Sequence, residues 1–189
     1  MTVLKIFIDQ GHNPQNPNAG AEANGVREQD VTYIVGVELA ALLRADPFFE
    51  VRLSRNSPTE QLGTSVATSL AARVNAANSW GADYFISLHC NSSPNTNASG
   101  SEVYVYSEES PAFPLGEAIL VGLQNATGLP SRGMRINPGL YVLRRTQMPA
   151  LLVEMGYLTN INDADLLATN PGLFARGIYN GMRAYFQLT

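Results

Sequence analysis

The chain has 189 residues, of which 45% are apolar and 15% are charged, and its formal net charge is −4 at pH 7. A chain of this length can bury one good hydrophobic core, so we expect a single domain over residues 1–189. The acidic charge balance argues against a nucleic-acid-binding surface or a polybasic membrane anchor, because both need clustered Lys and Arg. No apolar run approaches the length of a membrane span, and Met1 leads into a strand-like pattern without the marks of a signal peptide.

The first half of the chain alternates strand-like and helical patterns. A strand is predicted over residues 4–9, followed by a loop rich in Asn, Gly and Pro. A helix begins near Arg27, because Val31, Val35 and Leu39 recur at helical spacing on one face. A strand over residues 51–54, a helix over residues 68–80 and a strand over residues 84–89 complete this half.

The second half continues the alternation. A strand is predicted over residues 102–106, and Ser110 with Pro111 forms an N-cap and first-turn pair that opens a helix ending at Gly128. Strands follow over residues 140–143 and 150–154, and Asn170 with Pro171 opens the last helix. Strands interleaved with helices of this length predict an α/β fold. We expect an open, mostly parallel central sheet of about six strands with helices on both faces.

The two histidines of the chain, His12 and His89, each close a predicted strand. A lone histidine is more often a packed ring than a ligand, but the carboxyl ends of strands in an α/β sheet are where side chains converge on a ligand. Both are therefore candidate metal ligands. Strand alternation points the Cys90 side chain away from His89, which predicts an inert buried thiol. Because Cys90 is the one cysteine of the chain, an intrachain disulfide is excluded.

Two glutamates extend this set. Glu28 could simply complement the helix dipole, but it shares a stripe with Val31 and Val35, where a carboxylate needs a cation. Glu154 follows a buried-looking strand, and a charge there is costly unless it is paired or catalytic. Two histidines, one glutamate ligand and a further glutamate match a catalytic zinc site. Asp9 either orients a ligand of that site or only ties down its own loop.

Four segments, DQGH, VREQDVTY, SLHCN and LRRTQMPALLVEMGYLTN, resemble the ordered motifs of the zinc-dependent N-acetylmuramoyl-L-alanine amidases. The resemblance covers nearly the whole chain. It implies a single bound Zn²⁺ and hydrolysis of the amide between the lactyl group of N-acetylmuramic acid and L-alanine in peptidoglycan. Position by position, it implies that His12, Glu28 and His89 are the metal ligands and that Glu154 is catalytic. One departure is Asn13, where many relatives have glycine.

Three further residues are candidates for substrate contact: Asn91, Arg144 and Asn160. The alternative is that the asparagines only form turns and that the arginine is a solvated surface residue. We expect a monomer. The family resemblance implies action at the bacterial cell wall, although the chain shows no export signal of its own. Two rival functions stay open at this point, a catalytically idle wall-binding domain and a zinc carboxypeptidase acting on the stem peptide.

Overall fold

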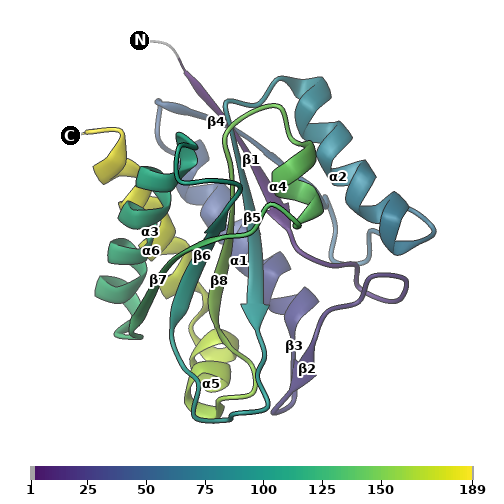
Figure 1. Cartoon of the computed structure of the whole chain (residues 1–189), viewed down its shortest axis with the longest axis vertical. Helices are drawn as coiled ribbons and strands as arrows, with labels where there is room; N and C mark the ends of the chain where they lie inside the picture. Colours follow the sequence, from purple (N-terminus) through teal and green to yellow (C-terminus); the bar gives the residue numbers. More distant parts are fainter. Residues whose placement is uncertain (1–2, 189) are drawn as a thin grey trace.

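The structure, a computed structural model, describes residues 3–188 and contains a central sheet with helices packed on both sides (Figure 1). The strands are β1 (Leu4–Gln10), β2 (Glu22–Ala23), β3 (Val26–Arg27), β4 (Phe49–Leu53), β5 (Tyr84–Asn91), β6 (Ser101–Val105), β7 (Ser131–Ile136) and β8 (Ala150–Tyr157). The helices are α1 (Glu28–Arg44), α2 (Val66–Trp80), α3 (Ala112–Thr127), α4 (Tyr141–Arg145), α5 (Ile161–Thr169) and α6 (Pro171–Tyr185).

The central sheet has six strands in the order β4-β1-β5-β8-β6-β7, and β2 pairs with β3 in a separate short hairpin. The four strands β4, β1, β5 and β8 are parallel to one another. Strand β6 is antiparallel to β8, and the edge strand β7 is parallel to β6. The predicted α/β class and the mostly parallel six-stranded sheet are confirmed.

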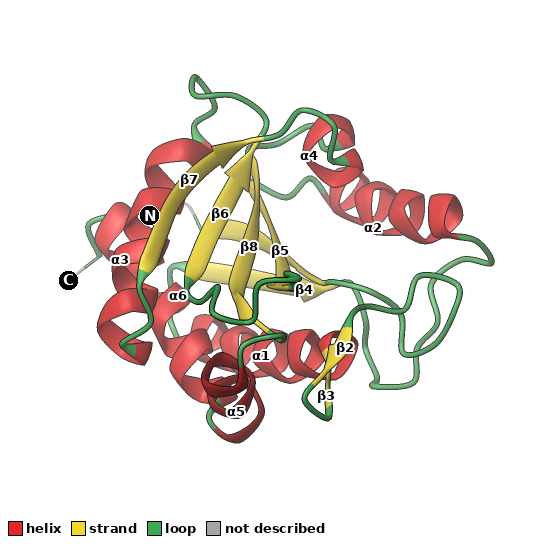
Figure 2. Ribbon diagram, turned by 60° about the horizontal axis from the view of Figure 1, so that its bottom comes forward, coloured by secondary structure: helices red, strands yellow, loops and turns green. Residues whose placement is uncertain are grey.

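The helices divide between the two faces of the sheet (Figure 2). Helices α1, α3 and α6 cover one face, where Val35 and Ile178 pack against strand residues such as Ile8 and Leu88. Helices α2 and α4 cover part of the other face and pack against Phe7, Phe85 and Leu152. No helix formed by residues 3–188 combines the length and apolar character that crossing a bilayer requires.

The strand predicted over residues 140–143 is wrong, because this segment forms the N-cap and first residues of helix α4. Val142 and Leu143 are both buried, on the side of the helix that packs against α2 and β8. A run of four apolar residues fits a buried strand and a buried helical turn equally well, so the pattern alone could not separate them.

Other differences lie at element ends and in elements that were not predicted. Helix α3 begins at Ala112, one residue later than predicted, with Pro111 at the N-cap and Ser110 Oγ accepting from the Ala112 N–H at 3.2 Å. The last helix begins at Pro171 as predicted. Strand β7, helix α5 and the β2–β3 hairpin were not predicted. Strand β7 contains two arginines and a glycine, helix α5 is nine residues long, and each hairpin strand has two residues.

Candidate metal centre

Three side chains from different elements converge at the carboxyl end of the parallel strands. His12 lies just after β1, Glu28 is the first residue of α1, and His89 lies near the end of β5. Glu28 Oε1 is 3.1 Å from His12 Nε2 and 2.9 Å from His89 Nδ1. One potential ligand atom from each residue lies within 4.8 Å of the other two. The structure therefore brings together the three residues that the sequence indicated as ligands.

Two glycines allow this close approach. A Cβ atom on Gly11 would lie 2.5–2.6 Å from the ring of His89, and a Cβ atom on Gly20 would lie 2.8 Å from Glu28 Oε2. His12 itself has a φ of 68°, a left-handed conformation that turns the chain out of β1. The tight packing explains why the loop after β1 needs small residues next to the histidines.

The Glu28 carboxylate is held as an anion. Its Oε1 accepts from the Cys90 N–H at 3.0 Å, and its Oε2 accepts from the Ala21 N–H at 2.9 Å. Burial alone would raise the pKa of Glu28, but hydrogen bonds and charge from His12 and His89 lower it far below its usual range. Two imidazole nitrogens and one buried carboxylate oxygen form a donor set that fits a divalent metal such as zinc.

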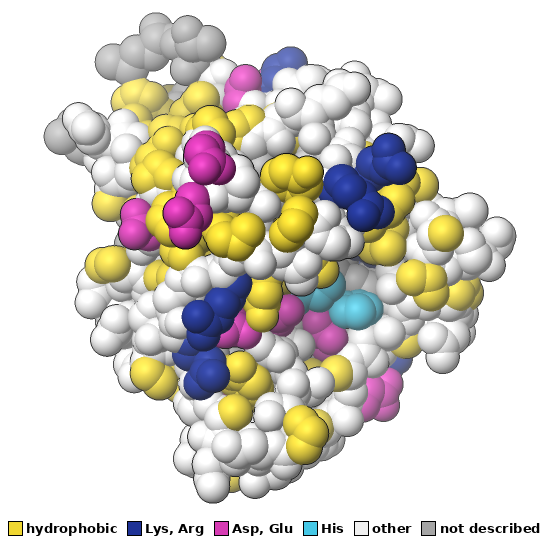
Figure 3. All heavy atoms as spheres, in the orientation of Figure 1, with side chains coloured by type: hydrophobic (Ala, Val, Ile, Leu, Met, Phe, Trp, Pro, Cys, Tyr) yellow, Lys and Arg dark blue, Asp and Glu magenta, His cyan; other side chains and the backbone are white. Residues whose placement is uncertain are grey.

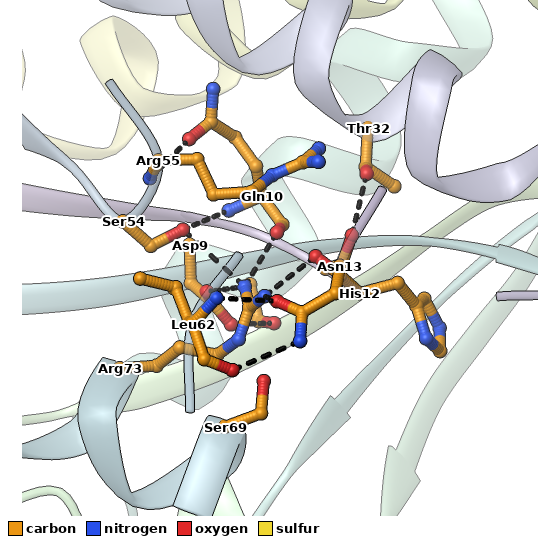
Figure 4. Close-up of polar contacts among 12 residues, drawn as sticks. Asp9, Gln10, His12, Asn13, Thr32, Ser54, Arg55, Leu62, Ser69 and Arg73 are labelled. Carbon is orange, nitrogen blue, oxygen red and sulfur yellow. Dashed lines mark hydrogen bonds and ion pairs between the residues drawn. The ribbon is translucent and has the colours of Figure 1, made fainter. Parts of the chain in front are cut away.

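A buried arginine holds the loop that carries His12 (Figure 4). Arg73, on α2, donates from Nη1 to Asp9 Oδ1 at 2.6 Å and from Nη2 to the His12 carbonyl at 2.5 Å. Ser87 Oγ donates to the other Asp9 oxygen at 2.8 Å. Burial by itself would raise the pKa of Asp9, but the Arg73 guanidinium brings it below its ordinary value. Asp9 therefore ties down the loop, and it makes no hydrogen bond to either histidine within residues 3–188.

Asn13 closes the same loop from the inside. Its side chain is fully buried, and Nδ2 donates to the carbonyls of Pro17 and Leu62 at 2.8 and 2.9 Å. Its Oδ1 accepts from the Leu62 N–H at 3.1 Å. A glycine at this position could make none of these bonds, so the Asn13 side chain joins the 13–17 loop to the segment before α2.

Glu154 lies beside the cluster on β8. It is directly opposite His89 on β5 and directly opposite Glu102 on β6, so the three side chains share one face of the sheet. Its Oε2 is buried and has no hydrogen-bond partner among the described residues. Burial first, and then the charges of Glu28 and Glu102, raise the pKa of Glu154 to about 8. A carboxyl group with a pKa near neutrality can both accept and release a proton under physiological conditions.

Glu102 is a site residue that the sequence reasoning missed. It is 4% exposed and accepts from Asn91 Nδ2 at 2.7 Å and from the Tyr104 hydroxyl at 3.0 Å. Two arginines of β7, Arg132 and Arg135, lie 3.6 and 3.4 Å from its Oε2. The sequence did contain a signal for Glu102, because it is an acidic residue inside a predicted strand and shares one face of that strand with Tyr104.

The three candidates for substrate contact lie in different surroundings. Asn91 faces Glu102 and therefore borders the cluster. Asn160 is the N-cap of α5, where its side-chain oxygen accepts from the N–H groups of Asn162 and Asp163. Arg144 is exposed in the last turn of α4 and lines a separate hollow with Tyr106. Substrate contact by these residues stays a prediction.

Cys90 is on the opposite face of β5 from His89. It is 4% exposed and packs in the main hydrophobic core. Burial, followed by the charges of Glu28 and Glu154, raises its thiol pKa well above the ordinary value. The expected burial of Cys90 is confirmed, and its inertness stays a prediction.

Comparison with known proteins identifies the family. A family model described as N-acetylmuramoyl-L-alanine amidase matches residues 6–184. The chain belongs to the N-acetylmuramoyl-L-alanine amidase family. An amidase of this family from Bacillus licheniformis, CwlM, is 37% identical over 191 residues that cover 99% of this chain and 70% of that protein. The sporulation-specific amidase of Bacillus subtilis is 35% identical and aligns with 98% of this chain and 69% of its own length.

The fold agrees with solved amidase structures. The catalytic domain of CwlV, an N-acetylmuramoyl-L-alanine amidase from Paenibacillus polymyxa, superposes with a TM-score of 0.85 at 29% identity. The match covers 99% of this chain and all of that domain. The six-stranded sheet and its surrounding helices are therefore those of an amidase catalytic domain.

Proposed function

We propose that residues 1–189 form one catalytic domain, a zinc-dependent amidase that hydrolyses the bond between N-acetylmuramic acid and L-alanine in peptidoglycan. His12, Glu28 and His89 hold the zinc ion, and Glu154 transfers the proton. The observation that carries this proposal is the convergence of His12 Nε2, Glu28 Oε1 and His89 Nδ1 beside the unpaired Glu154 Oε2. Family membership supports the choice of bond and substrate.

The donor set supports zinc over other divalent metals. Imidazole suits zinc, copper, iron and nickel, whereas magnesium and calcium prefer sites made only of oxygen ligands. Three protein ligands are also the number that catalytic zinc sites typically use, so His12, Glu28 and His89 would suffice to hold the ion. When bound, zinc supplies Lewis-acid chemistry, because it lowers the pKa of water and polarises a carbonyl group.

Glu154 performs the proton transfers. Its Oε2 accepts the proton of the water that attacks the lactyl carbonyl and then delivers it to the nitrogen of L-alanine as the carbon–nitrogen bond breaks. The second transfer is needed because an amide anion is a very poor leaving group. Burial raises the pKa of Glu154 above its ordinary value, which favours a carboxyl group that can hold the proton between the two steps.

Digestion of purified muropeptides tests the proposed function. Released stem peptides that begin with a free L-alanine amino group support the amidase. Stems shortened at their carboxyl end would instead indicate the carboxypeptidase, and an unchanged digest from folded, zinc-loaded protein would indicate an idle wall-binding domain. Glu154→Gln protein, measured in parallel, controls for a contaminating hydrolase.

A further inference from the structure

A row of charged side chains crosses four neighbouring strands on the site-bearing face of the sheet. His89 on β5 is directly opposite Glu154 on β8, which is directly opposite Glu102 on β6. Beyond Glu102, Arg132 and Arg135 on the edge strand β7 complete the row. Figure 3 shows basic side chains over β7, acidic side chains next to them and the histidines beyond, around one hollow.

An irregularity in β7 places both arginines in this row. Ser131 is paired with Ser101, but Met134 is paired with Val103, so β7 contains one more residue than β6 between these pairs. Gly133 lies in the extra stretch with a φ of 85°, a conformation that glycine adopts without strain. Residues three apart normally point to opposite faces of a strand, but the bulge turns Arg132 and Arg135 toward the same carboxylate.

The pair carries more positive charge than its partner neutralises. Two guanidinium groups face one carboxylate, Glu102, at 3.4 and 3.6 Å, which is longer than the usual 2.7–2.9 Å of a strong charge-assisted hydrogen bond. The side chains are 36% and 47% exposed, whereas Glu102 is buried. The terminal nitrogens of Arg135 donate to no residue among 3–188, so they are free to bind an anion.

Arg132 is held in place. Its guanidinium stacks on the ring of Tyr157 at 5.1 Å, and its Nη1 donates to the Ser99 carbonyl at 3.3 Å. A fixed guanidinium loses less side-chain entropy when it binds a ligand than a mobile one does. The two arginines thus combine a fixed group with an open one.

The spacing of the strands relates this pair to the reacting bond. Strands β8 and β7 are two strand spacings apart in the sheet, or about 10 Å at about 4.8 Å for each spacing. An extended peptide advances about 3.3–3.6 Å per residue, so a peptide leaving Glu154 reaches β7 at its second or third residue.

We propose that Arg132 and Arg135 bind a carboxylate on the second or third residue of the stem peptide and thereby fix the direction of the substrate in the site. This inference rests on the proposed function, because it takes the scissile amide to lie at Glu154. The sugar would then lie on the opposite side of the histidines from β7.

Kinetics on matched substrates test the inference. The substrates are synthetic muramoyl tripeptides with free carboxylates, with the carboxylate of residue two amidated, or with that of residue three amidated. On the free substrate, Arg135→Gln should raise KM about tenfold with kcat within about twofold, the loss typical of one charge-assisted hydrogen bond. With the parent protein, one of the two amidated substrates should have a KM about tenfold higher than the free substrate has. Arg135→Gln should not raise the KM of that amidated substrate further.

Arg176→Gln, which removes an exposed arginine from α6, is the matched control and should leave KM unchanged. If Arg135→Gln raised KM equally on all three substrates, the inference would be contradicted, because the arginine would then act through Glu102 and Glu154. An unchanged KM in folded Arg135→Gln and Arg132→Gln proteins would also overturn it.

Calorimetric binding of the free tripeptide separates this inference from the proposed function. The tripeptide should bind the parent about tenfold more tightly than it binds Arg135→Gln, whether or not the protein cleaves any muramoyl substrate. Equal affinities would contradict the carboxylate site. Absence of cleavage by zinc-loaded parent protein would contradict the proposed function and leave the binding comparison to decide the arginine site.

Discussion

Replacing Glu154 by glutamine should remove a pH-dependent loss of stability from the metal-free protein. The folded-state pKa of Glu154 is raised from 4.5 to about 8, mainly because the carboxyl group is buried. The folded state therefore binds this proton more tightly than the unfolded state does. The stabilisation by the proton is fully present below about pH 4.5 and is lost as the pH rises through about 8.

The magnitude follows from the width of this window. Between the two pKa values the free energy of unfolding falls by about 1.4 kcal/mol for each pH unit, so it falls by about 3–4 kcal/mol from pH 5 to pH 8. Glutamine has nearly the same shape and does not titrate. Glu154→Gln protein should therefore gain about 3–4 kcal/mol relative to the parent between these two pH values.

Urea unfolding of both proteins after treatment with a chelator measures this difference at each pH. Contributions from other titrating groups are shared by the two proteins and largely cancel in the comparison. A difference in stability that stays constant from pH 5 to pH 8 would refute the reasoning, since it would mean that Glu154 has an ordinary pKa in the fold.

Four further substitutions separate the parts of the site. His12→Ala or His89→Ala should lose stoichiometric zinc and activity together, because two remaining ligands cannot hold the ion firmly. Full zinc occupancy of either variant in metal analysis would show that the replaced histidine has only a structural role. Gly11→Ala should weaken zinc binding in a competition titration, because its Cβ would lie 2.5–2.6 Å from the His89 ring, and unchanged affinity would contradict the packing described. Cys90→Ala should keep hydrolysis near the parent level and lose about 1 kcal/mol of stability from a small cavity, whereas a folded, zinc-loaded variant without turnover would indicate a thiol nucleophile.

The sequence was sufficient for the parts of the fold that depend on apolar periodicity. Strands β1, β5 and β8 and helices α1, α2 and α6 carry regular apolar patterns, and each was predicted to within a few residues. Strand β7 was missed because it is an exposed edge strand that contains two arginines and a glycine. Helix α4 was predicted as a strand because its apolar run is too short to show a period.

The proximity of His12, Glu28 and His89 could be predicted because strand ends converge in a parallel sheet and because Glu28 shares the buried stripe of α1. The residues that surround them could not be predicted. Glu102 joins the site only because β6 is antiparallel to β8 in one particular register, and strand pairing between distant segments has no signal in a single sequence. The hydrogen bond from Arg73 to the His12 carbonyl likewise depends on how α2 packs over β1.

The central claim is that Glu154 transfers the proton and does not bind the metal. Zinc content and muropeptide hydrolysis, measured on one preparation of Glu154→Gln protein, test it most directly. The account predicts a folded protein that retains one zinc ion per chain while kcat falls by about 10²- to 10⁴-fold, with a smaller change in KM. Near-parental hydrolysis by the zinc-loaded variant would contradict the role of Glu154 in proton transfer, and loss of zinc would make Glu154 a metal ligand instead.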